Sequence, residues 1–303
     1  MFRIAISLAR FNRHIMEEMM SVRASIKAWV AAIFLVPGLT VVAFAQREPI
    51  EFIEDNSFLI EEAYNQEPGV VQHIFQAVYS NDPRQRGWAF AFTQEWPIYG
   101  QDHQFSYTIL GYHLINEGER QYGVGDTLLN YRYQALEEGP GKPAFAPRFS
   151  LIIPTGNRDK GTGNGVVGYQ WSLPFSKKVA SRLALHANFG ITYLPHVRSP
   201  MNNGQLSPKR SLVSSWVGGS AIYALLPRLH LMLEWLGIIE DNINGAGRPV
   251  RTFNPLLSPG VRTAVFNEED LQIVAGVGVP IGLNRQANNV AGFFYFSVEH
   301  KLF

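Results

Sequence analysis

The feature that most constrains this chain is a strict alternation of side chains across residues 181–194. A period of two is typical of a β-strand with one apolar and one polar face. The run is nearly twice as long as an ordinary strand, and its length suits a tilted strand that crosses a bilayer. One face carries Leu183, Leu185, Ala187, Phe189, Ile191 and Tyr193, and the other carries Arg182, Ala184, His186, Asn188, Gly190 and Thr192.

The same alternation recurs in twelve stretches of residues 71–303, with no convincing amphipathic helix between them. An even number of strands is what bacterial outer-membrane barrels have, and it places both chain ends on the periplasmic side. The fold class predicted is therefore all-β, a 12-stranded antiparallel transmembrane β-barrel. Its strands are expected at 71–80, 87–96, 104–114, 124–135, 145–153, 166–173, 182–194, 212–225, 229–238, 256–266, 271–279 and 291–303.

The connections between these stretches support a barrel with two different rims. If the first strand rises from the periplasm, long outer loops fall at 116–123, 195–211 and 239–255. The tight turns at 226–228 and 267–270 then fall on the opposite rim, as the rule of short periplasmic turns expects. Residues 174–180 are expected to form a medium-length turn on that same rim.

The composition agrees with a surface that faces lipid. Charged residues make up 17% of the chain, below the roughly 25% of an ordinary soluble domain. Aromatic residues are abundant, with 20 Phe, 12 Tyr and 6 Trp, and rings near strand ends suit the headgroup belts of a membrane barrel. A soluble sandwich could use the same rings as its core, so it stays the rival fold.

Residues 1–45 have the form of a secretory signal peptide. Arg23 and Lys27 precede an uncharged apolar run that ends at Ala43-Phe44-Ala45, a small-x-small cleavage site. The run is too short for a spanning helix. Met20 begins a signal of normal size by itself, so the true start is expected there.

Removal of residues 1–45 leaves 21 Lys and Arg against 23 Asp and Glu. A nucleic-acid surface would need a basic patch that survives processing, so no nucleic-acid partner is expected. The partners expected are outer-membrane lipids, the barrel insertion machinery and a small-molecule solute.

Residues 46–70 form an acidic segment outside the alternating pattern. Asn56 or Ser57 is suited to cap a short helix through Tyr64, before Pro68-Gly69 stops it. Charge runs are usually solvated, which favours a periplasmic lead-in. The alternative is a plug folded into the barrel mouth.

Sequence motifs for cofactors, metals and catalysis are weak. The glycine spacing of residues 163–168 resembles a dinucleotide fingerprint, but a strand that ends in Pro174 follows it where a helix is required. The histidines of the mature chain do not pair at metal-ligand spacing, and there is no cysteine. We therefore expect no cofactor, no metal and no enzymatic activity.

Polar residues in phase with the inner faces of the strands are the candidate site. Arginines that line a pore favour anions, and structural ion pairs inside the lumen are the equally weighted alternative. The lumen and selectivity candidates are Asp126, Asn130, Arg132, Gln134, Arg148, Arg182, His186, Asn188, His230, Glu234 and Arg262.

Several stretches resemble a known family of outer-membrane, transporter-like proteins, the "putative meta-pathway of phenol degradation" group. They are residues 56–72, Gly123-Val-Gly-Asp126 leading to Tyr131-Arg-Tyr133, Leu151-Ile-Ile-Pro-Thr-Gly156 and Gly276-Val-Gly-Val-Pro-Ile-Gly282. The resemblance implies a secreted membrane barrel that passes small, aromatic compounds. The terminal Phe303 also resembles the C-terminal insertion signal of such barrels, although Lys301 departs from it.

Together these features predict a channel or transporter for small solutes in the outer membrane of a Gram-negative bacterium, with aromatic or anionic compounds as candidate solutes. Two alternatives stay open. One is a structural or adhesive barrel with a closed lumen, and the other is a barrel lipid hydrolase. Residues 46–70 or the loop 195–211 are candidates for gating or occlusion.

Overall fold

The structure is a computed structural model and describes residues 52–53, 55–81, 85–116, 119–201, 204–284 and 290–302. Residues 1–51 and Phe303 lie outside these ranges, and with them the expected signal peptide and the expected insertion signal. The strands are β1 (Val70–Asn81), β2 (Gln85–Pro97), β3 (His103–Asn116), β4 (Glu119–Tyr133), β5 (Ala144–Phe145), β6 (Arg148–Ile153), β7 (Gly168–Ala180), β8 (Leu183–Val197), β9 (Arg210–Leu226), β10 (Leu229–Ile243), β11 (Pro249–Glu268), β12 (Leu271–Gly278), β13 (Ile281–Gly282) and β14 (Ala291–Lys301).

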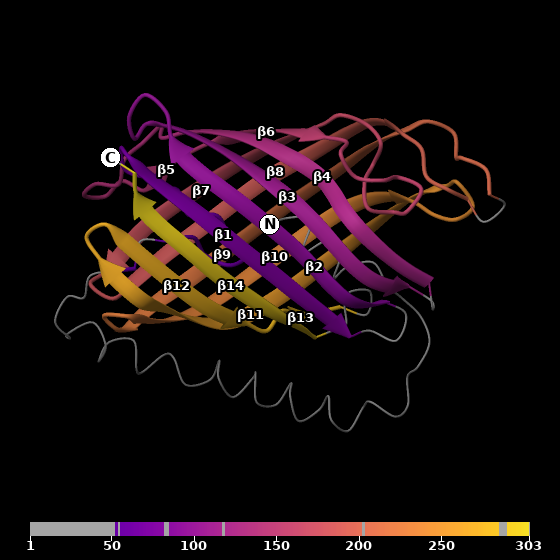
Figure 1. Ribbon diagram of the computed structural model, residues 1–303. Coiled ribbons are helices and arrows are strands. Elements are labelled where there is room, and N and C mark those ends of the chain that lie inside the picture. Colours follow the sequence, from indigo (N-terminus) through magenta and orange to yellow (C-terminus); the bar gives the residue numbers. More distant parts are fainter. Residues whose placement is uncertain are drawn as a thin grey trace, which may run out of the picture.

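These strands close into one antiparallel barrel (Figure 1). Closure occurs because β14 pairs with β12 on one side and with β1 on the other, in a register that runs from Val70 opposite Lys301 to Ser80 opposite Ala291. Within the described ranges, twelve strands of six or more residues form the wall, and the two-residue strands β5 and β13 pair with β7 and β11. The predicted 12-stranded barrel is confirmed.

The two faces of the wall differ as the alternation predicts. On β8, Leu185, Phe189 and Ile191 are 43%, 49% and 42% exposed on the outer face. His186 and Asn188 point inward and are 4% and 3% exposed. Closure leaves no unpaired sheet edge, and an apolar outer face is what a lipid-embedded barrel requires. Separately, the described part of the chain has no helix that is long and apolar enough to span a membrane.

Strands extend beyond the predicted bounds at both rims. The long outer loops expected at 116–123 and 239–255 are wrong. Strand β3 extends to residue 116 and β4 begins at residue 119, while β10 extends to residue 243 and β11 begins at residue 249, so the connections are shorter than expected. Outside the membrane a hairpin has no lipid face, so its sequence need not alternate. The expected turn at 174–180 is also wrong. Pro174 continues β7, and since β6 pairs with β7 only up to Ser172, proline removes no ladder bond to β6.

One rim carries both ends of the barrel chain and the tightest turns. The C-terminal end lies beside the beginning of β1 (Figure 1). Residues 181–182, 227–228 and 269–270 connect strands at this rim. Short turns of outer-membrane barrels face the periplasm, so we name it the periplasmic rim.

The outer face of β8 provides a test of membrane embedding. The variant Ile191→Arg should lose about 2–4 kcal/mol of unfolding free energy, because it places a charge in the hydrocarbon region. Val250→Arg is the control, because Val250 is similarly exposed (39%) on the part of β11 beyond the predicted membrane strand. Urea unfolding from lipid vesicles measures both variants. Equal losses would contradict a lipid contact at Ile191.

Candidate functional site

The described residues of 52–69, which we name the lumenal segment, lie inside the barrel as far as Gln66, and Glu67 and Pro68 are exposed. Phe58 and Ile60 have no exposed surface, and Ser57 and Ala63 are equally buried. The segment has no helix, so the helix expected to end at Tyr64 is wrong. Contacts with the barrel wall override the local capping signal, as tertiary context commonly does for short helices.

Wall side chains bind the backbone of the lumenal segment. Glu234 Oε1 accepts hydrogen bonds from the N–H groups of Leu59 (2.9 Å) and Ile60 (3.1 Å). Asn188 binds both backbone groups of Glu61, accepting from its N–H at 2.6 Å and donating to its carbonyl at 2.8 Å. A buried chain without secondary structure must find partners for its backbone. Here strands β8 and β10 supply them.

The returning half of the segment is held in the same way. Ser176 Oγ accepts from Ala63 N at 2.7 Å, and Gln134 donates to the Ala63 carbonyl at 2.9 Å. Gln104 accepts from Gln66 N at 2.8 Å. These partners come from β7, from the residue after β4 and from β3. The segment is therefore fixed to several separate strands near the periplasmic rim.

Arg262 on β11 is directed at the entering half of the segment. Its guanidinium donates to the carbonyls of Ile53 (3.0 Å), Asp55 (2.8 Å) and Asn56 (2.9 Å). It also contacts the Glu62 carboxylate at 3.2 Å, and it is 1% exposed. A guanidinium has five N–H donors in a fixed fork, so one side chain can bind several oxygens of a bent chain.

Arg132 and Arg148 bind the segment through Glu61. Arg148 Nε lies 2.9 and 3.0 Å from the two carboxylate oxygens, and Arg132 Nη1 lies 3.4 Å from one of them. Ser172 Oγ donates to the same carboxylate at 3.2 Å. Burial opposes ionisation of Glu61, but the two guanidinium groups outweigh it and lower the pKa of this carboxyl below its usual value.

Asp55 lies in a different environment. Tyr295 and Ser297 on β14 donate to its carboxyl oxygens, and Gln72 donates at 2.6 Å. Burial raises the pKa of Asp55 above its usual value, although Arg262 and these donors act in the other direction. Asp55 therefore anchors the segment to the β14–β1 seam where the barrel closes.

Phe58 occupies a notch made by glycines of the wall. Its ring stacks on Phe293 with centroids 5.1 Å apart. A Cβ on Gly276 would lie 2.4 Å from Phe58 Cζ, and a Cβ on Gly260 would lie 2.8 Å from Cε2. Distances this short are not tolerated, so glycine is required at both positions while the ring is docked.

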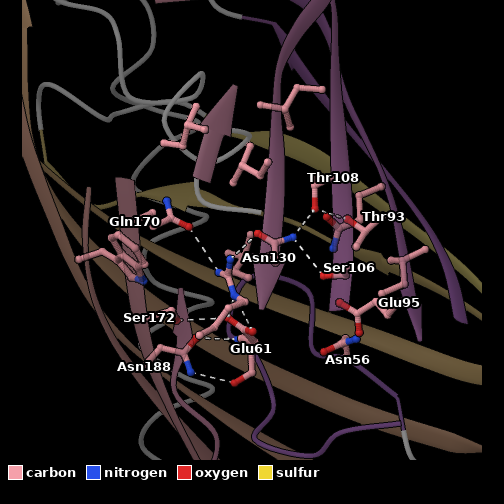
Figure 2. A pocket seen from close by; sticks show the side chains of 18 of the residues that line it. Asn56, Glu61, Thr93, Glu95, Ser106, Thr108, Asn130, Gln170, Ser172 and Asn188 are labelled. Carbon is pink, nitrogen blue, oxygen red and sulfur yellow. Dashed lines mark hydrogen bonds and ion pairs between the residues drawn. The ribbon is translucent and has the colours of Figure 1, made fainter. Parts of the chain in front are cut away.

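A cavity of about 70 Å³ lies in the lumen next to the segment (Figure 2). It is enough for several water molecules. Glu61, Arg148 and Asn188 form part of its polar wall, and Asn130 links that wall to Ser106 and Arg148 by hydrogen bonds of 3.1 and 3.0 Å. The wall also includes the carboxyl group of Glu95 and several polar side chains of the neighbouring strands. An apolar patch lies beside them, with Leu110, Leu128, Ile152, Trp216 and Leu236.

The eleven residues proposed from the sequence divide into two groups in the structure. Those that contact the lumenal segment or line its cavity are Asn130, Arg132, Gln134, Arg148, His186, Asn188, His230, Glu234 and Arg262. Asp126 instead accepts hydrogen bonds from Gly156 and Asn164 of the outer loop after β6. Arg182 lies in the β7–β8 turn and donates to the Leu225 carbonyl.

Several residues of the site do not follow from strand phase alone. Glu61, Phe58 and Asp55 belong to the lumenal segment, and Ser176 lies in the stretch expected to be a turn. A usable signal was charge complementarity, since an acidic segment and a lumen rich in arginine occur in one chain. Strand phase cannot show which carboxylate meets which arginine.

A serine, a histidine and a carboxylate lie near one another in the lumen, the residue types of a catalytic triad. They are Ser176, His186 and Glu62. Ser176 Oγ lies 2.7 Å from His186 Nδ1, and His186 Nε2 lies 3.9 Å from Glu62. The serine hydroxyl is 1% exposed and already accepts the Ala63 N–H bond. In this state Ser176 holds the segment through Ala63, and its hydroxyl is covered.

The comparisons with known proteins agree with the fold. Residues 69–195 match the model of the protein family described as "Putative MetA-pathway of phenol degradation". The predicted family resemblance is confirmed. The phenol-degradation family match begins at the boundary of β1, so most of the lumenal segment lies before the matched range. No curated protein sequence matches the chain.

Solved structures resemble the chain as a whole. An outer membrane channel from Pseudomonas putida F1 aligns with a TM-score of 0.61 at 11% identity, covering 82% of this chain and 99% of that one. The NanC porin aligns with a TM-score of 0.49 at 12% identity over 76% of this chain and 100% of that one. The Pseudomonas putida F1 channel supports the fold of this chain. Together with the apolar outer face, it makes the chain an outer-membrane β-barrel.

The glycine notch provides a test of how the segment is held. Because the chain has no cysteine, Ile60→Cys introduces a single reporter at a fully buried position. Adding Gly276→Ala should displace Phe58 and raise the maleimide labelling rate about tenfold, equivalent to about 1.4 kcal/mol of lost docking energy. Gly219→Ala is the control, because its nearest contact would be an ordinary 3.5 Å. Unchanged labelling in the Gly276 variant would contradict the notch.

Proposed function

We propose that the chain is an outer-membrane channel for small solutes and that the lumenal segment closes it. The observation that carries the proposal is a lumen filled by a segment that is not part of the wall. A barrel of this width exceeds the eight-stranded case that side chains fill, and it is narrower than open porins. The segment occupies the space through which a solute would pass.

The path of the segment favours a removable closure. Ile53 lies near His230 at the beginning of β10, and Gln66 binds Gln104 at the beginning of β3. Both strand ends are at the periplasmic rim, as is Val70, where β1 begins. The segment therefore enters and leaves through the same rim, and it can withdraw without breaking a strand.

The cavity walls suggest the class of solute. Leu110, Leu128 and Trp216 offer an apolar surface, and Arg148 offers a positive charge. The family description names phenol degradation, and the similar structure from Pseudomonas putida F1 is called an outer membrane channel. These observations support passage of small aromatic or anionic compounds. Neither the cavity walls nor the family description indicates catalysis at the covered Ser176 hydroxyl. We propose that the chain has no enzymatic activity.

Deletion of residues 52–66 tests the channel. The purified variant should give stable open currents in planar bilayers, whereas the full chain should be closed for most of the recording. Heat-modifiable migration on a denaturing gel checks that the deleted variant still forms a barrel. A folded variant without conductance would favour the alternative of a structural or adhesive barrel with a closed lumen.

Export and insertion complete the proposal. Residues 1–45 are removed as a signal peptide, and Phe303 takes part in recognition by the barrel insertion machinery. Expressed in a Gram-negative host, the outer-membrane protein should begin at Gln46, and N-terminal sequencing measures this directly. Phe303→Ser should reduce the amount of heat-modifiable barrel in the outer-membrane fraction. A mature protein that keeps residues 20–45 would contradict the cleavage.

A further inference from the structure

The Glu61 carboxylate occupies a receptor that the barrel wall supplies. Both of its oxygens meet Arg148 Nε, at 2.9 and 3.0 Å, and Ser172 and Arg132 complete the set of donors at 3.2 and 3.4 Å. Charge-assisted hydrogen bonds from several donors form a strong and geometrically specific carboxylate site. The ligand in this site is a side chain of the segment that fills the lumen.

The receptor opens onto the cavity. Glu61, Arg148 and Ser172 all line the cavity, and the Arg148 side chain is 17% exposed, compared with 3% for Arg132. Figure 2 shows Glu61 beside Ser172 and Asn188 and joined to both by dashed lines, with Asn130 and Gln170 above them in the view. A second carboxylate that enters through the cavity therefore meets Arg148 as Glu61 leaves.

An apolar patch of the cavity wall suits an apolar body. Leu110, Leu128, Ile152 and Trp216 line it together with the receptor. Indole and aliphatic side chains provide most of the binding surface in small-molecule sites, while a few placed polar groups orient the ligand. A carboxylate receptor next to such a surface fits a small carboxylic acid with an aromatic or aliphatic body.

We infer that such carboxylates bind this cavity, displace Glu61 from Arg148 and Arg132, and thereby release the lumenal segment. This inference rests on the proposed channel function and names its substrate class and its opening signal. The exchange replaces one carboxylate by another, so no bond is made or broken covalently. Neutral aromatic compounds lack the group that competes with Glu61.

Exchange lowers the cost of opening. If the segment withdraws alone, Arg132 and Arg148 lose the Glu61 carboxylate and its charge-assisted hydrogen bonds, and only water replaces them. A bound solute carboxylate keeps the two arginines paired. The solute therefore binds the open state more tightly than the closed state, which is the condition for a ligand to shift a two-state equilibrium.

The test uses benzoate as the probe and benzyl alcohol as its neutral counterpart, on the full chain with the Ile60→Cys reporter. Benzoate should raise the labelling rate and the bilayer conductance about tenfold, which corresponds to a coupling of about 1.4 kcal/mol. Benzyl alcohol should change neither. Glu61→Gln should raise labelling without benzoate and reduce the further effect of benzoate.

Arg148→Met should remove the benzoate response. Arg182→Met is the matched control, because Arg182 lies in the β7–β8 turn, outside the cavity wall, and donates to the Leu225 carbonyl. Equal effects of benzoate and benzyl alcohol would overturn the inference. So would a benzoate response that survives Arg148→Met, or no response to benzoate while the variant lacking residues 52–66 conducts. If that deleted variant does not conduct, the channel function fails, and labelling of Ile60→Cys still reports whether benzoate releases the segment.

Discussion

Every backbone polar group of a membrane-spanning wall must be satisfied within the protein, and this constraint determines the structure. A sheet satisfies it in lipid only by closing on itself, as the pairing of β14 with β1 does here. Closure fixes a lumen, and a barrel of this width is too wide for its own side chains to fill. The lumenal segment fills the space, but its backbone then needs partners too. Asn188, Glu234 and Arg262 supply them from the wall.

The inner polar faces of the strands therefore have a role that alternation alone does not reveal. In an open porin, polar residues on these faces contact water and solute. Here most of them bind a neighbouring stretch of the same chain, so their geometry is specific to that stretch. Asn188 illustrates this, since one amide matches both the N–H and the carbonyl of Glu61. The structure contains the ion pairs of the lumen arginines, and in the channel we propose the same side chains would face the solute once the segment has left.

Much of the fold could be predicted from the sequence, because lipid on one side and a polar interior on the other impose a period of two. The prediction was weakest where that condition ends. The hairpins extend beyond residues 114 and 238, where the sequence does not keep the predicted alternation. Pro174 indicates a turn in the sequence, because the sequence does not show that it lies past the last pair between β6 and β7. The inward direction of residues such as Arg132 and Glu234 followed from phase. Their partners did not, because Glu234 and Leu59 are 175 residues apart.

The segment is held by two kinds of interaction that respond differently to a solute. Phe58 in its glycine notch is held by shape, and only displacement of the ring weakens that contact. Glu61 is held by charge, and the solute carboxylates we propose compete with it for Arg148. The notch is formed by β11, β12 and β14, whereas the carboxylate receptor lies across the lumen on β4, β6 and β7. A solute that competes at the receptor alone leaves the notch intact, so the released part can dock again when the solute has passed.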